Sequence, residues 1–182
     1  MTYSEIIRSV EAFAEKHCRR CPYDPTLWEN HTQLVREFAL QLAQIEGADK
    51  QVVEIAALLH DAGKYKGRID HHLTGYKLAR DFLETVDLPD DKKALILKCI
   101  LKHRTRFAVE DNEIEVKVVQ SADVLGTLFD ETWQTHSQNR MSREALGRLY
   151  DKAMGKINLE SARRLAAPQL EKLRTLLEDY QS

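Results

Sequence analysis

The sequence predicts an all-helical fold around one hydrophobic core. Its apolar residues mostly recur three and four positions apart, which is the spacing of one helix face. Seven glycines and four prolines are few for 182 residues and favour helices over a sheet of short strands. An apolar fraction of 43% is enough for a core at this length, so we expect a single domain over residues 1–182.

The N-terminal third predicts two amphipathic helices. The first runs from Ser4, its expected N-cap, to about Lys16. Residues 18–28 are expected to form a loop. A second helix begins near Asn30 and ends at Gly47, where the left-handed conformation of a C-cap costs least.

Three further helices follow in the middle of the chain. Asp49 can cap a helix over residues 50–61, and this helix is apolar nearly all round, which predicts that it is buried. A basic loop over residues 64–68 leads to a helix over about 70–86. Pro89 and Asp90 then start a helix that reaches His103.

The C-terminal third is less regular at its start. Residues 113–133 mix strand-like alternation at Ile114, Val116 and Val118 with helical spacing from Val119 onward. We favour a helix because no partner strand is evident. The leucines and alanines after Ser142 predict two more amphipathic helices, in which no residue is expected to take part in chemistry.

Charge and cysteine content exclude several classes of protein. The 27 lysines and arginines almost balance 29 acidic residues, so we expect no nucleic acid polymer and no membrane as partner. Three cysteines cannot all pair, and the N-terminus lacks the apolar run of a signal peptide, which together predict a reduced, cytoplasmic protein. The roles of Cys18 and Cys21, and the oligomeric state, stay open.

Five ionisable residues lie on or at the end of apolar helix faces: His31, His60, Asp61, His103 and Asp123. Ionisable side chains are seldom buried without a partner. A divalent metal ion would explain all five, because imidazoles and carboxylates are its ligands and its charge offsets the cost of burying the carboxylates. Ligands of this kind suit Mn, Fe, Ni, Co, Zn or Mg, and the sequence does not choose among them.

The order of these residues resembles the HD-domain superfamily, which consists of all-helical, metal-dependent phosphohydrolases. The resemblance rests on His31, on His60-Asp61 within LLHDAGKYK, on the later histidines, and on Asp123 within QSADVLG. It covers about residues 28–130, and INLESARRLAAPQ is similar to the C-terminal helix of small stand-alone bacterial HD proteins. It implies an HD core at 28–130 with the N-terminal and C-terminal helices packed on it.

The resemblance also implies a set of ligands. Those for one ion are His31, His60, Asp61 and Asp123, with Asp61 able to bridge to a second ion. In members with two ions, two more histidines complete the site, and His71 and His103 match their positions. Helical phase does not separate His71 from His72, and only the family pattern, with Gly75 four residues later, favours His71. Whether one or two ions bind stays open.

Two basic clusters suggest how a substrate would be held. One follows the HD pair and the other surrounds His103, and their expected substrate-binding members are Lys64, Lys66, Arg104 and Arg106. The resemblance places Lys64 beside the substrate. Besides Asp61 and Lys64, we expect His72 or His103 to be catalytic, by protonating the leaving oxygen.

These features together predict a metal-dependent phosphohydrolase. Its substrate would be a phosphate ester or anhydride in a nucleotide or a related small phosphorylated metabolite. Two alternatives use the same scaffold: a di-iron HD-type oxygenase, and a non-catalytic nucleotide-binding HD protein. The basic clusters favour phosphoryl chemistry, but no motif identifies the substrate.

Overall fold

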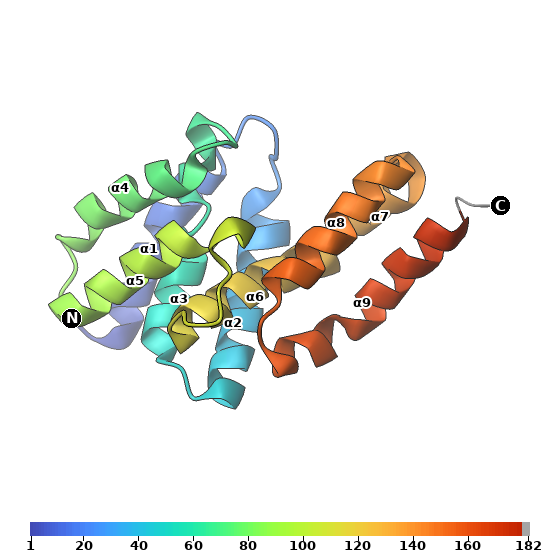
Figure 1. Cartoon of the computed structure of the whole chain (residues 1–182). Coiled ribbons are helices and arrows are strands. Elements are labelled where there is room, and N and C mark those ends of the chain that lie inside the picture. Colours follow the sequence, from blue (N-terminus) through green and yellow to red (C-terminus); the bar gives the residue numbers. More distant parts are fainter. Residues whose placement is uncertain (180–182) are drawn as a thin grey trace.

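The computed structural model describes residues 1–179, apart from the side chains of 136–140, and contains no strand in that part of the chain. The fold is all-helical, as the sequence predicts (Figure 1). The expected single domain also included residues 180–182, which lie outside the described residues. The elements in chain order are α1 (Tyr3–Cys18), η1 (Leu27–Thr32), α2 (Gln33–Glu46), α3 (Lys50–Leu59), η2 (Ala62–Lys66), α4 (His71–Leu83), α5 (Asp90–Lys102), η3 (Thr105–Phe107), α6 (Ile114–Phe129), α7 (Glu131–Arg140), α8 (Arg143–Lys156) and α9 (Glu160–Asp179).

Helix α3 is the centre of the hydrophobic core. All residues from Val52 to Leu59 are buried, and the helix contacts α1, α2, α5 and α6. Its sequence is apolar nearly all round, so every face removes apolar surface from water. The predicted burial of this helix is therefore confirmed, and the residues that follow it emerge from the middle of the molecule.

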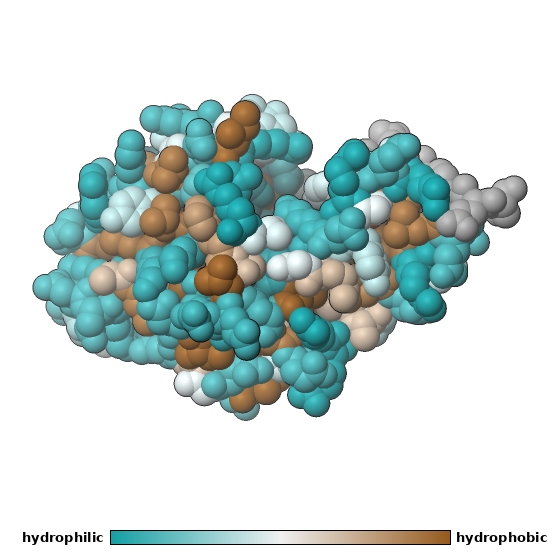
Figure 2. Space-filling model, in the orientation of Figure 1, coloured by the Kyte–Doolittle hydropathy of each residue, from teal (hydrophilic) through white to brown (hydrophobic). Residues whose placement is uncertain are grey.

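Helices α8 and α9 pack against α6, next to the body formed by α1–α5. α9 contacts α2, α6 and α8, and α8 also contacts α6 and η3. In Figure 1 these helices extend to the right of the body formed by α1–α5. Figure 2 shows that the surface is notched between the two parts. No helix among the described residues combines the length and apolarity needed to cross a bilayer.

Several helix ends match the sequence analysis and others do not. Gly47 ends α2 in the left-handed conformation, and Asp49 caps α3 by accepting backbone N–H bonds, both as predicted. The expected N-cap at Ser4 is wrong. Thr2 caps α1 instead, because Thr2 and Glu5 form a capping box in which each side chain accepts the other's backbone N–H. Ser4 lies inside the first turn.

The helix bounds in the middle and C-terminal parts of the chain agree only in part with the sequence analysis. Residues 114–129 form one helix, as favoured over a strand. The predicted helix over 50–61 stops at Leu59, so that His60 and Asp61 occupy the turn after it. A separate helix, α7, begins after Asp130, which caps it. The sequence analysis missed α7 because its residues are polar and carry no apolar period.

Two glycines bring α4 against the turn that follows α3. A Cβ atom on Gly63 would overlap the carbonyl oxygen of His71 and the backbone nitrogen of Gly75. Only a residue without a side chain allows this contact between two backbones. The contact fixes the start of α4 beside the His60-Asp61 turn.

We predict that Gly63→Ala lowers the free energy of unfolding by at least about 2 kcal/mol, because backbone atoms must move to accept the methyl group. Gly147→Ala is the matched control. Gly147 lies within α8 with open space around its Cα, so alanine should raise stability by roughly 0.5–1 kcal/mol. Urea unfolding of the two variants measures both effects. Equal stability of Gly63→Ala and the unsubstituted protein would contradict the role given to this contact.

Candidate metal centre

Asp61 lies at the centre of a cluster of four histidines. Its side chain is only 2% exposed. Oδ2 is 3.4 Å from Nε2 of His31 and 3.2 Å from Nε2 of His60. Oδ1 is 3.3 Å from Nε2 of His71 and 3.9 Å from Nε2 of His103. Each carboxylate oxygen therefore faces its own pair of imidazoles.

Helix ends bring these four histidines together. His60 and His103 are the C-cap residues of α3 and α5, and His71 is the first residue of α4. His31 lies in η1, a turn of π-helix that precedes α2. Side chains at the ends of different helices can converge on one point, whereas four histidines spread along one helix could not all reach it. The cluster therefore depends on the packing of four separate elements.

Asp123 joins the cluster from α6. Its Oδ1 lies 3.2 Å from Nε2 of His31 and 3.8 Å from Nε2 of His60. Gly126, one turn later, makes room for this approach. A Cβ atom there would overlap Cγ2 of Val35 and lie 3.4 Å from Nδ1 of His31. The absence of a side chain at this position lets α6 and α2 pack closely enough to bring Asp123 to His31.

Hydrogen bonds to backbone carbonyls fix which nitrogen carries a proton in three of the four imidazoles. Three histidines direct Nδ1 at 2.7 Å to a carbonyl oxygen three residues earlier: His60 to Ala57, His71 to Arg68, and His103 to Ile100. A carbonyl only accepts, so Nδ1 is the donor and a neutral ring has its lone pair on Nε2. Nε2 of His71 nevertheless lies 2.9 Å from Nε2 of His103, and the Nε2 atoms of His60 and His31 are 3.3 Å apart. In the His71–His103 pair both lone pairs face each other, which suits a cation between them.

Burial and neighbouring charges together set the charge states of His103 and Asp61. Burial lowers the pKa of His103 well below the ordinary value, and the charge of His60 acts in the same direction, so His103 stays neutral. Burial alone would raise the pKa of Asp61, but His60, Lys64 and His31 outweigh it and the pKa is well below the usual range. The neutral His103 imidazole and the ionised Asp61 carboxylate are donors of the kind that a divalent metal ion takes.

The ligand atoms form two groups that could each hold a metal ion. One group is His31, His60 and Asp61, the other is Asp61, His71 and His103, and in each the atoms lie within 4.8 Å of one another. Asp61 belongs to both. Its Oδ2 is fully buried and has the Lys64 ammonium as an ion-pair partner besides the imidazoles of His31 and His60. A buried carboxylate oxygen of this kind fits a metal ligand.

The structure separates the two histidines that the sequence left open. His71 faces Asp61, as the family pattern favoured. His72 is 1% exposed and points elsewhere, with Nε2 at 2.6 Å from Nη2 of Arg106. His72 is also absent from the described residues that line the cavity above the cluster. A catalytic role for His72 stays a prediction of the sequence alone.

A cavity of about 570 Å³ opens above this cluster. Its lining includes six cationic side chains and three carboxylates, whereas the chain as a whole has a net charge of −2. The cations are Lys64, Arg68, Arg104, Arg106, Lys152 and Lys156. A local excess of positive charge in a concave site favours anionic ligands.

Three of the four predicted substrate-binding residues line this cavity: Lys64, Arg104 and Arg106. Lys66 is not among the described lining residues, and its Nζ lies 5.7 Å from the centre of the Tyr65 ring. Lys64 forms an ion pair with Oδ2 of Asp61. Burial would lower the pKa of Lys64, but the charge of Asp61 outweighs it and raises the pKa, so the ammonium group stays charged.

Helix α8 contributes two lysines that the sequence analysis missed. Lys152 and Lys156 both line the cavity, and Nζ of Lys156 forms an ion pair with Oδ2 of Asp123. The sequence analysis expected no residue of the C-terminal helices to take part in chemistry, whereas the structure places these two lysines beside the candidate site. A signal was present, because Lys156 continues the apolar spacing of Leu149 and Ala153, which places it on the buried face of the helix.

Comparison with known proteins places this geometry in a family. The HD domain model matches residues 28–128. A comparison with curated proteins finds no match. One similar solved structure is a predicted HD superfamily hydrolase from an uncultured Thermotogales bacterium, with 23% identity, a TM-score of 0.66, and coverage of 100% of this chain and 98% of that chain.

Two further solved structures are similar to this chain over nearly its whole length. An HD-superfamily hydrolase from Bacillus thuringiensis has 22% identity and a TM-score of 0.70, over 99% of this chain and 97% of that chain. YpgQ from Bacillus subtilis in complex with ADP has 23% identity and a TM-score of 0.61, over 98% of this chain and 97% of that chain. At these identities the likeness shows the fold alone. The family match covers more than half of the 182 residues and contains the histidine and aspartate cluster, and on that evidence the chain belongs to the HD domain family.

Proposed function

We propose that the protein is a metal-dependent phosphohydrolase that cleaves a phosphate ester or anhydride in a small molecule. The observation that carries the proposal is the position of Asp61. Its two oxygens face two pairs of imidazoles at the base of a cavity lined by six cationic side chains. Membership in the HD domain family supports the same chemistry.

The proposed ligands follow the two groups of atoms in the cluster. Those of the first ion are His31, His60, Asp61 and Asp123, and those of the second are Asp61, His71 and His103. Bound divalent ions would supply Lewis acidity, which lowers the pKa of a water and polarises a phosphoryl oxygen. The backbone carbonyls behind His60, His71 and His103 hold the rings in the orientation and tautomer that this needs.

The cavity cations have a distinct role in this proposal. The transition state of phosphoryl transfer spreads negative charge over the equatorial oxygens. Lys64, Arg104 and Arg106 line the cavity with cationic N–H donors. Donors fixed in advance by the fold stabilise this charge without having to reorganise during the reaction.

The arrangement favours an anhydride over an ester. His103, which the sequence offered as a proton donor, directs Nδ1 to Ile100 and has Nε2 among the ligand atoms. A phosphate leaving group, whose second pKa is about 6, is weakly basic and departs without a general acid. An alkoxide leaving group would need one. The proposed substrate is therefore a phosphoanhydride.

A nucleotide is the proposed form of that substrate. The cavity volume of about 570 Å³ lies within the range of small-molecule sites, and Trp133 and Leu149 give its wall apolar surface beside the cations. The solved structure of YpgQ holds ADP, a molecule with one phosphoanhydride bond. ADP and ATP are accordingly the first substrates to test.

The direct test strips the protein of metal and adds Mn, Co, Ni, Mg or Fe separately, with ADP or ATP as substrate. We expect phosphate or pyrophosphate release that requires added metal and proceeds without oxygen. Oxygen uptake coupled to substrate loss would support the di-iron oxygenase instead. Nucleotide binding without turnover with any of these metals would support the non-catalytic alternative.

We predict that the number of metal ions lost on substitution depends on whether the residue belongs to one ligand group or to both. Asp61→Ala should lose both ions because Asp61 belongs to both groups, whereas His71→Ala should keep about one equivalent. His17→Ala is the matched control, since His17 is also buried and directs Nδ1 to a backbone carbonyl, that of Phe13, but belongs to neither group. Elemental analysis after dialysis against Mn²⁺ measures the content. Equal metal loss in His71→Ala and Asp61→Ala would contradict this dependence.

We predict that Arg106→Ala lowers kcat/KM for the anhydride roughly 10- to 100-fold, through kcat as well as KM. The variant loses a charged donor from the cavity wall, and such a hydrogen bond contributes about 1.5–3 kcal/mol. Arg80→Ala is the control, because Arg80 is exposed and pairs with Asp81 on the surface. Steady-state kinetics on both variants measures the effect. A kcat/KM for Arg106→Ala equal to that of Arg80→Ala would remove Arg106 from the binding site.

A further inference from the structure

Lys156 is a buried lysine that the HD domain match does not include. It is the last residue of α8, beyond the matched residues 28–128, and it is 2% exposed. An ammonium group is costly to remove from water unless an opposite charge compensates it. Its Nζ forms an ion pair with Oδ2 of Asp123, so the compensating charge comes from the metal centre.

The two oxygens of Asp123 have different partners. Oδ1 faces Nε2 of His31 at 3.2 Å and Nε2 of His60 at 3.8 Å. Oδ2 faces Lys156. A carboxylate held at one oxygen by a lysine has only the other oxygen free to join the imidazoles, and its rotation about the bond to Cβ is restrained.

We propose that Lys156 is a positioning residue that holds Asp123 with Oδ1 alone toward the ligand imidazoles, which makes α8 part of the metal centre. The inference rests on one part of the proposed function, which is that the cluster binds a divalent ion. It does not depend on the reaction or on the substrate.

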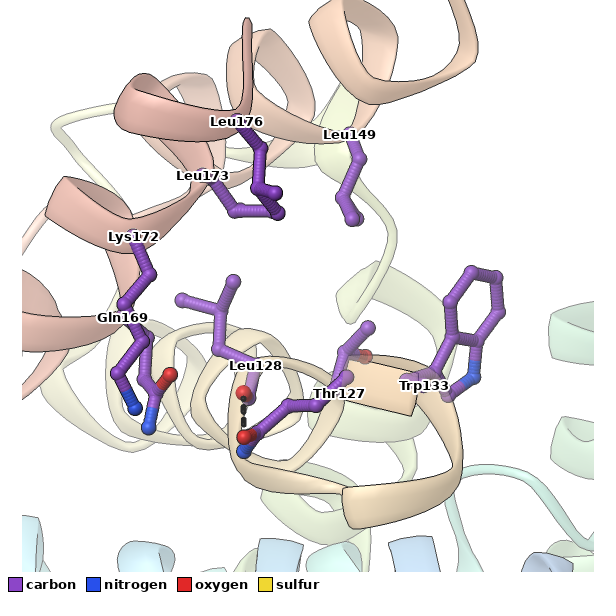
Figure 3. Close-up of a pocket in the computed structure, with 9 residues that line it drawn as sticks. Thr127, Leu128, Trp133, Leu149, Gln169, Lys172, Leu173 and Leu176 are labelled. Atoms are coloured by element: carbon purple, nitrogen blue, oxygen red, sulfur yellow. Dashed lines mark hydrogen bonds between the residues drawn. The ribbon is translucent and has the colours of Figure 1, made fainter. Parts of the chain in front are cut away.

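Apolar packing fixes α8 independently of the ion pair. Leu146, Ala153 and Ile157 are nearly fully buried, at 0%, 3% and 3% exposure. Figure 3 shows Leu149 of α8 and Leu173 and Leu176 of α9 around a small cavity above α6. A substitution that removes only the charge of Lys156 should therefore leave the helix in place.

α8 also contacts η3, the turn next to Arg104 that carries Arg106. A Cβ atom on Gly155 would lie 3.9 Å from Cγ2 of Thr105, which stands between Arg104 and Arg106. The end of α8 thus lies between the helix that carries Asp123 and the turn that carries Arg106. This position links the C-terminal helices to the ligand side and to the substrate side of the proposed site.

The test compares Mn²⁺ affinity, measured by titration without substrate, in Lys156→Met and the unsubstituted protein. We expect Lys156→Met to bind Mn²⁺ at least about tenfold more weakly, which is the usual cost of removing a partner of a metal ligand. Lys156→Arg keeps the charge and should recover most of the affinity. Lys152→Met is the matched control: it removes a cavity cation one turn earlier on α8 and should change the Mn²⁺ affinity by less than about twofold.

A double-mutant cycle with Asp123→Ala separates positioning from a general structural effect. In the Asp123→Ala background, Lys156→Met should weaken Mn²⁺ binding no further, because the group it positions is gone. Circular dichroism checks that each variant is folded, and Lys156→Gln replaces Lys156→Met, with the same expected loss, if the latter does not fold.

Three results would overturn the inference: unchanged or tighter Mn²⁺ binding by Lys156→Met, the same loss in the Asp123→Ala background, or no Mn²⁺ binding by the unsubstituted protein. A failure of the proposed function is distinguishable from these. It would appear as the absence of phosphate release from a protein that binds Mn²⁺ normally.

Discussion

The burial of the Asp61 carboxylate is the constraint on which the rest of the site depends. A carboxylate that is 2% exposed and still ionised needs positive charge or hydrogen-bond donors close to it. Lys64 supplies one charge, and the imidazoles around both oxygens add donor atoms whose lone pairs favour a metal cation. The buried α3, the close contact at Gly63 and the helix ends that carry the histidines all bring partners to this one group.

Much of this could be predicted from the sequence, for a physical reason. Helix periodicity and the cap at Asp49 depend on residues close together in the chain, so they can be read directly. The cluster could be predicted because His31, His60 and Asp123 interrupt apolar faces, and burial of such groups is costly without a shared partner. The order of these residues along the chain then indicated the family, which the match over residues 28–128 confirms.

Features that depend on packing could not be predicted in the same way. His71 and His72 are equally distant from the apolar face of their helix, and only the contact of α4 with the turn at Gly63 directs His71 to Asp61. Lysines are usually solvated, so the spacing that buries Lys156 was not interpreted as a site. Its partner, Asp123, lies 33 residues away in sequence, a distance at which the pattern of one helix carries no information.

Diffraction from crystals grown with Mn²⁺, with data collected at the manganese absorption edge, tests the central claim most directly. The account predicts two anomalous peaks that share Asp61 as a ligand, one bonded also to His31 and His60 and the other to His71 and His103. A structure in which no manganese contacts Asp61, and the carboxylate remains paired only with Lys64, would contradict it.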